Sequence, residues 1–161
     1  LSLKAEQARL AKELLFDGQF EYYQELKDLN TGDEKEFYDE LKTKLKKDNR
    51  WQAKKMYVNL IEQEEDTEEI MAYVRENPHY IVRYAELLKD NYADEVDVLY
   101  SNHIRSAAHS SSKRSAYQDV CGLIRRYKNI IGKDNAAELV NELLVLYKKK
   151  RALVDELSKL D

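Results

Sequence analysis

Residues that form tight turns are scarce in this sequence, with four glycines and one proline among 161 residues. β-Sandwiches and barrels need frequent turns, so the shortage argues against an all-β fold. No apolar run approaches the roughly 18 residues that a membrane-spanning helix needs. No signal-peptide pattern of basic, apolar and small residues opens the chain. We therefore expect no membrane partner.

Cysteine is also nearly missing, since Cys121 is the one cysteine in the chain. A single cysteine cannot form an internal disulfide, and a reducing compartment is the simplest setting for such a protein. The sequence therefore predicts a cytoplasmic localisation. The chain begins at Leu1 without an initiator methionine, and we expect it to be a fragment of a longer protein.

Charged and hydrophobic residues dominate what is present. They make up 36% and 43% of the chain, and the mean hydropathy is −0.76. Apolar side chains recur at the i, i+3, i+4, i+7 spacing that lines one face of an α-helix, and no segment alternates for long enough to be a strand. The pattern predicts an all-α fold of about ten antiparallel helices of roughly 10 to 18 residues each.

The order of these helices suggests an architecture. Successive pairs begin near residues 3, 33, 66 and 93, a spacing of about 30 that approaches the roughly 34 residues of tetratricopeptide repeats. We therefore favour stacked helical hairpins, an α-solenoid or tetratricopeptide-like arrangement, with a compact helical bundle as the main alternative. We expect residues 1–161 to form a single domain, with possible halves at 1–76 and 77–161.

Several local predictions can be compared with a structure. The first helix should bury Leu3, Leu10 and Leu14. A sixth helix should begin at Pro78, with Asn77 as its cap, and a separate seventh helix should cover residues 96–107. The caps expected elsewhere are Asp33, Asp66 or Thr67, the serines Ser110, Ser111 and Ser112 before the helix of residues 117–131, and Gly132 after it.

Histidine and cysteine do not combine into a convincing site. His103 and His109 are six residues apart, whereas zinc-binding pairs on a helix usually lie at i and i+4. We expect His103 to be partly buried, and His79 and His109 to be exposed. Cys121 lies on an apolar stripe, where a free cysteine usually serves as a small hydrophobic residue. The sequence therefore predicts no enzyme, no metal or other cofactor and no small-molecule substrate.

Twelve tyrosines stand out in the composition. Most of them fall on the apolar stripes, so we expect them at seams between helices, with their hydroxyl groups reaching water. Tyr22 and Tyr92 are the better candidates for surface contacts.

The segment 101–133 is strongly basic within an acidic protein. It holds seven Lys or Arg residues and one acid, Asp119, in a chain whose formal net charge is −4. Such a segment suits phosphate or an acidic partner, or it docks against the acidic half of its own chain or against a neighbour. No nucleic-acid-binding motif accompanies it, and the pI of about 5.5 argues against a dedicated nucleic-acid domain. The candidate binding surface comprises Arg105, Lys113, Arg114, Arg125, Arg126 and Lys128.

The C-terminal half resembles a known family. The stretch SAYQDVCGLIRRYKNIIGKDNAAELVNELLVLYKKKRALVDELSKL is similar to the helical region that closes many bacterial SWIM zinc-finger proteins, over roughly residues 73–160. The residues that carry the resemblance are Arg114, Tyr117, Leu143, Leu144, Tyr147, Arg151, Ala152, Leu153, Asp155, Glu156 and Leu157. One departure is that Ala152 follows Arg151 directly, where a proline would be expected between them.

The family is named after a C-x-C…C-x-H zinc motif, which a chain with one cysteine lacks. The resemblance therefore implies the helical part of a longer bacterial protein and carries over no zinc ligand. It also implies binding to a partner, because the family's motif is associated with DNA or protein binding. We expect a non-catalytic helical-repeat scaffold that binds a protein partner, with nucleic-acid binding through residues 101–133 as the alternative.

Overall fold

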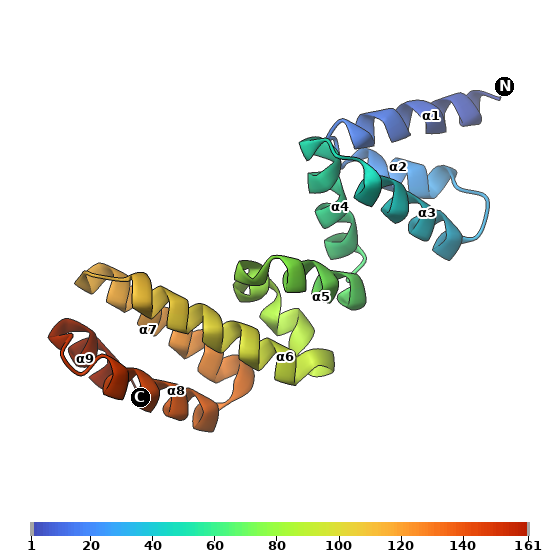
Figure 1. Cartoon of the computed structure of the whole chain (residues 1–161). Coiled ribbons are helices and arrows are strands. Elements are labelled where there is room, and N and C mark those ends of the chain that lie inside the picture. The colour runs from blue at the N-terminus through green and yellow to red at the C-terminus, as the bar shows by residue number, and fades with distance from the viewer. Residues whose placement is uncertain (1, 161) are drawn as a thin grey trace. The chain divides into compact units, whose positions relative to one another are not determined.

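A computed structural model describes residues 2–160, and these residues form an all-α fold with no strand (Figure 1), which confirms the predicted fold class. Within residues 2–160, nine α-helices and one short 3-10 helix follow one another, close to the ten helices expected. Their bounds are α1 Leu3–Phe16, α2 Tyr22–Leu29, α3 Glu34–Lys47, α4 Trp51–Gln63, α5 Thr67–Glu76, the 3-10 helix Pro78–Tyr80, α6 Ile81–Ser110, α7 Arg114–Ile131, α8 Lys133–Leu146 and α9 Arg151–Ser158.

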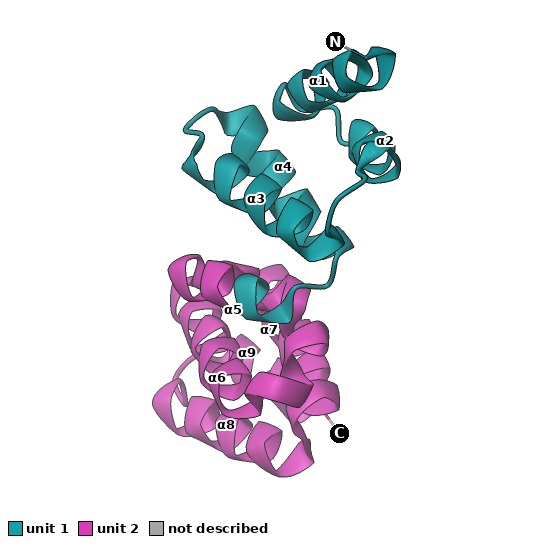
Figure 2. Ribbon diagram, turned by 90° about the vertical axis from the view of Figure 1, so that its right-hand side faces the viewer, with its two compact units in different colours: residues 1–70 teal, residues 71–161 magenta. Residues whose placement is uncertain are grey.

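The chain divides into two compact units, residues 1–70 and 71–161, coloured teal and magenta in Figure 2. The division falls inside α5, a few residues before the predicted boundary between residues 76 and 77. The expectation of a single domain, and the choice between stacked hairpins and a bundle, stay predictions.

In the first unit, α1 packs against α2, α3 packs against α4, and α1 also contacts α4. Its core holds the fully buried Leu15, Leu45 and Leu60. The predicted stripe of α1 is wrong in phase, because Leu3 and Leu10 are 91% and 47% exposed, while Ala11 and Leu15 are buried. Apolar residues lie on several sides of this helix, so spacing alone does not select the face that packs.

Three tyrosines in the first unit donate hydrogen bonds to acids that follow α4, and a lysine contacts each acid as well. Tyr hydroxyl-to-carboxylate distances are 2.6–2.7 Å, and the lysine Nζ distances are 2.9–3.0 Å. Each lysine also lies over a tyrosine ring. The clusters are Tyr23–Glu64–Lys27, Tyr38–Asp66–Lys42 and Tyr57–Glu69–Lys46.

In the second unit, α7 packs against α6, α8 and α9. The predicted sixth and seventh helices run together as α6, whose backbone leaves helical geometry only at Tyr92, with φ −136° and ψ 37°. No glycine or proline stands at this kink, so the sequence shows where the apolar stripe is interrupted but not that the helix continues.

The observed caps correct two expectations. The side chains of Asp33 and Asp66 accept backbone N–H bonds at 2.9 and 3.2 Å, as expected for caps. Asn77 instead donates its side-chain amide to the Tyr73 carbonyl, at 3.0 Å, before the 3-10 helix begins at Pro78. The three serines do not cap α7 either, since the backbone of Lys113 holds that position without a side-chain bond.

Ser110 and Ser111 act on the preceding helix. Their hydroxyl groups donate to the carbonyls of Ser106 and Ala107, at 2.9 and 2.5 Å, and so satisfy carbonyl groups in the last turns of α6. A serine hydroxyl can donate to a carbonyl behind it or accept from an N–H ahead of it, and composition alone does not separate these roles.

A candidate binding groove along α7 and α8

Two of the six predicted basic residues are held in ion pairs within the second unit. The Arg105 guanidinium contacts Glu142 of α8 through two nitrogens, at 2.7 and 3.1 Å. Arg114 contacts Asp155 and Glu156 of α9, at 2.7 and 2.6 Å. Both arginines thus bind acids of their own chain, but these acids lie among residues 134–161 and not in the acidic first half against which docking was considered.

These ion pairs change the acidity of their partners. The hydrogen bond from Arg105 lowers the pKa of Glu142, and the hydrogen bond from Arg114 lowers the pKa of Glu156. Glu156 is only 6% exposed, so removing Arg114 would leave a nearly buried carboxylate with less positive charge to offset the cost of its burial. We therefore assign Arg105 and Arg114 primarily to holding helices together.

The other predicted residues are placed differently. Lys113, Arg125 and Arg126 are exposed and form no ion pair with an acid of the described residues, whereas Lys128 is half-buried. Lys113 and Arg125 lie about 18 Å apart along the axis of α7, at 1.5 Å per residue. Arg126 is rotated by about 100° from Arg125. That all six form one binding surface stays a prediction, and Arg125 and Lys128 line one groove together.

The groove lies between α7 and α8 and encloses about 560 Å³. Arg125 and Lys128 of α7 and Lys133 of α8 supply its positive charge, with Asp134 as its acid. Its apolar lining comprises Ile124, Ala136, Ala137, Val140 and Leu160, and Asn129 and Asn141 add amide groups. A volume of this size lies within the roughly 300–1,000 Å³ range of ligand pockets.

Gly132 sets the geometry of this groove. It ends α7, as predicted, and its N–H donates to the Lys128 carbonyl at 2.9 Å. Its φ is +133°, a backbone conformation in which a residue with a side chain would be strained. α8 begins at the next residue, Lys133. A single glycine therefore joins the two helices, and Lys133 comes to line the same groove as Lys128.

The histidines and Cys121 lie as the sequence predicts. Cys121 is 1% exposed, and burial raises the pKa of its thiol. His103 is half-buried and burial lowers its pKa, while His79 and His109 are exposed. Within residues 2–160 no group of three His, Cys, Asp or Glu side chains could hold a metal ion. The expected absence of enzymatic activity and of cofactors stays a prediction.

Sequence reasoning did not single out the apolar part of the groove. Val140 and Leu160 come from α8 and from the residues after α9, and only folding brings them beside Arg125. Tyr22 and Tyr92, which were expected to make surface contacts, are half-buried. Tyr127 fits the expectation in part, because its ring is buried but its hydroxyl donates to Asp97 and not to water.

Comparisons with known proteins identify no relative. No protein-family model matches the chain, and no curated protein or solved structure matches it significantly. The similarity to SWIM zinc-finger proteins therefore stays a prediction. None of the helices in the described part of the chain is both long and apolar enough to cross a membrane.

Proposed function

We propose that this chain is a non-catalytic interaction scaffold that binds an acidic segment of a partner protein in the groove between α7 and α8. The observation that carries the proposal is the combination of three bases with an apolar lining in one groove. The same proposal places the chain in a larger intracellular protein similar to the SWIM zinc-finger family.

Charge and shape together favour a peptide with acidic residues around an apolar anchor. Arg125, Lys128 and Lys133 outnumber Asp134 around the groove, so a negatively charged segment is attracted to it. The alanines, Ile124 and Val140 offer apolar surface to a leucine or phenylalanine side chain. Short amphipathic segments commonly bind in this way, with apolar anchors in a groove and charged residues at its rim.

The groove suits nucleic acid less well. Phosphate backbones are bound by rows of available bases, and here Arg105 and Arg114 are already paired with Glu142, Asp155 and Glu156. The apolar lining offers aliphatic side chains, not the aromatic rings on which bases stack. Nucleic-acid binding through residues 101–133 therefore remains the alternative that the experiment below distinguishes.

The test measures fluorescence anisotropy of a labelled twelve-residue peptide, rich in glutamate with one central leucine. We expect the peptide to bind, and to bind more weakly when serine replaces its leucine. Arg125→Glu should weaken binding roughly tenfold, since it removes one charge-assisted contact and adds repulsion. Val140→Asp should do the same through the apolar lining.

Lys149→Glu is the matched control, because Lys149 is an exposed lysine after α8 that does not line the groove. It should change the affinity less than twofold. If Lys149→Glu weakens binding as much as Arg125→Glu does, the attraction is long-range charge and the groove is not the site. If the serine peptide binds as tightly as the leucine peptide, the apolar lining has no role.

A parallel salt series with single-stranded RNA and duplex DNA addresses the alternative. Binding that weakens steeply with salt, because neutralised phosphates release counterions, and that is lost in an Arg125→Glu, Arg126→Glu double variant, would support nucleic acid. We expect no such binding at physiological salt.

A further inference from the structure

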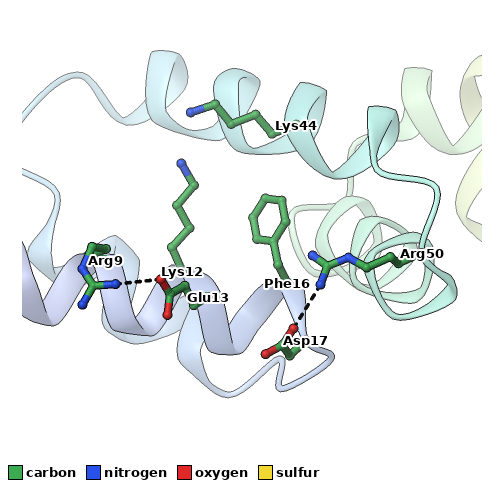
Figure 3. Close-up of a pocket in the computed structure, with 7 residues that line it drawn as sticks. All are labelled: Arg9, Lys12, Glu13, Phe16, Asp17, Lys44 and Arg50. Carbon is green, nitrogen blue, oxygen red and sulfur yellow. Dashed lines mark hydrogen bonds and ion pairs between the residues drawn. The ribbon is translucent and has the colours of Figure 1, made fainter.

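A second pocket lies wholly in the first unit, where α1 and α3 face each other beside the start of α4 (Figure 3). It encloses about 510 Å³. α1 contributes Lys12 and Phe16, α3 contributes Lys44, and Arg50 precedes α4. Figure 3 shows the Lys12 side chain and the Phe16 ring rising from α1 toward α3.

The acids of this pocket are already occupied. Glu13 pairs with Arg9 at 2.7 Å, and Asp17 pairs with Arg50 at 3.1 Å. Both pairs are drawn as dashed lines in Figure 3. Each arginine also contacts an acid outside the pocket, Arg9 with Glu6 and Arg50 with Asp48.

The two lysines are placed differently. Lys12 is half-buried, forms no ion pair with an acid of the described residues, and extends from α1 toward Lys44 of α3 (Figure 3); Glu40 of α3 attracts its charge from farther away. Lys44 contacts Glu40 at 3.0 Å, and Glu40 is 69% exposed and does not line the pocket. Two lysine side chains, from α1 and α3, thus come together at the wall of a cavity whose own acids are paired with arginines (Figure 3).

Such a contact between like charges is unfavourable in the free protein. A Lys44 ammonium that donates to the neutral amine of Lys12, and then burial, lower the pKa of Lys12, while the same contact with Lys12 and the hydrogen bond with Glu40 raise the pKa of Lys44. An anion between the two groups would remove the repulsion and let both remain charged. This region of an acidic unit is thus suited to an anion.

We propose that this pocket binds a small phosphate monoester, with its phosphate between the ammonium groups of Lys12 and Lys44 and its apolar body against Phe16. A monoester phosphate carries about 1.5 to 2 negative charges at pH 7, which matches two lysines better than one carboxylate does. The volume exceeds what a bare ion needs and lies within the roughly 300–1,000 Å³ range of ligand pockets. The proposal is independent of the groove between α7 and α8.

The experiment titrates the whole chain with phenyl phosphate by isothermal titration calorimetry. A separate measurement gives the midpoint of thermal unfolding with and without phenyl phosphate. We expect saturable binding and a rise of the midpoint, because a ligand that binds only the folded state stabilises it. Lys12→Gln and Lys44→Gln should each weaken phenyl phosphate binding roughly tenfold. Lys12→Gln should leave the midpoint of the free protein unchanged or higher, because it removes the like-charge contact.

Lys47→Gln is the matched control, since Lys47 is exposed on the same helix and does not line the pocket. It should change the affinity less than twofold. The proposal is overturned if Lys47→Gln weakens binding as much as Lys44→Gln, or if phenyl phosphate does not bind.

Two further probes identify the ligand's source. Inorganic phosphate should bind more weakly than phenyl phosphate, because it makes no contact with Phe16, and equal affinities would exclude a role for the organic part. A phosphoserine peptide that bound at least tenfold more tightly than phenyl phosphate would make the ligand a phosphorylated protein and overturn the small-molecule assignment.

Discussion

Two kinds of carboxylate contact can be compared between the units of this protein. The first unit, residues 1–70, has ten lysines and two arginines, whereas residues 71–161 have eight lysines and seven arginines. In the first unit, a tyrosine hydroxyl and a lysine share each carboxylate of the three clusters. In the second unit, arginines bind carboxylates directly, as Arg75 does with Glu95 and Arg105 with Glu142.

The difference concerns how much water reaches each contact. Asp66 and Glu69 have side chains that are 19% and 18% exposed, whereas Glu95 and Glu142 are 45% and 44% exposed. Exposed ion pairs are screened by salt and contribute little, whereas partly buried, hydrogen-bonded carboxylates depend less on salt. We therefore expect the tyrosine clusters to contribute more to folding than the exposed arginine pairs.

The largest expected effect comes from Asp66→Ala in the first unit. Asp66 accepts from the Tyr38 hydroxyl at 2.7 Å, from Lys42 at 3.0 Å and from the Glu69 N–H at the start of α5 at 3.2 Å. Losing these contacts and the cap should lower the free energy of unfolding by about 2 to 4 kcal/mol. Urea denaturation followed by circular dichroism measures the change.

The pH dependence of this loss provides its control. Burial opposes ionisation of Asp66, but the hydrogen bonds from Tyr38 and Lys42 outweigh it and lower its pKa. The ionic part of the stabilisation is therefore present above the ordinary pKa of Asp66 and is lost as the pH falls through the lowered value. Asp39→Ala, at a 51% exposed side chain 3.7 Å from Lys42, should cost far less, and an equal cost would remove the distinction between the units.

A smaller effect is expected from Arg114→Ala in the second unit. This change removes contacts with Asp155 and Glu156, while Lys159 stays within 3.3 Å of Glu156. Because Lys159 remains beside the nearly buried Glu156, the loss of stability should be below that of Asp66→Ala. The part that comes from Asp155, whose side chain is 53% exposed, should shrink in about 1 M salt, where the screening length is only about 3 Å. Arg126→Ala, at an exposed residue of the same helix, is the control; a loss that did not depend on salt would contradict the comparison.

The smallest effect is expected from Tyr100→Phe, and its sign is opposite. Tyr100 is fully buried, and its hydroxyl has no hydrogen-bond partner among the described residues. Removing an unpaired buried hydroxyl should leave stability unchanged or raise it by up to about 1 kcal/mol. Tyr127→Phe, which removes a bond to Asp97, should instead destabilise the protein in the same denaturation experiment.

The fold class was predictable because helical periodicity is a local property of the chain. The stripe from Tyr117 to Tyr127 has one clear face, and those residues are buried in α7 as expected. The stripe of α1 could not be assigned, because Leu3 and Leu10 compete with Ala11 and Leu15 for the packed face. The continuity of α6 through Tyr92 was not readable either, since no residue type marks it.

The candidate sites were predictable only in part. The basic segment pointed to Arg125 and Lys128. The sequence could not show that these two line a groove while Arg105 and Arg114 form ion pairs, because that depends on which acids the fold brings near each residue. Lys12 and Lys44, which line the same pocket, are 32 positions apart in the sequence. No local pattern announces such a contact, because it arises from the packing of helices and not from the period of either one.

The single tryptophan has a consequence for spectroscopy. Trp51 opens α4, is 71% exposed and follows Arg50, which lines the pocket between α1 and α3. Its indole emission reports mainly the solvent beside that pocket and is a poor monitor of core formation. Tryptophan fluorescence is therefore a poor measure of folding in this protein. Its folding is better followed through the circular dichroism of its helices.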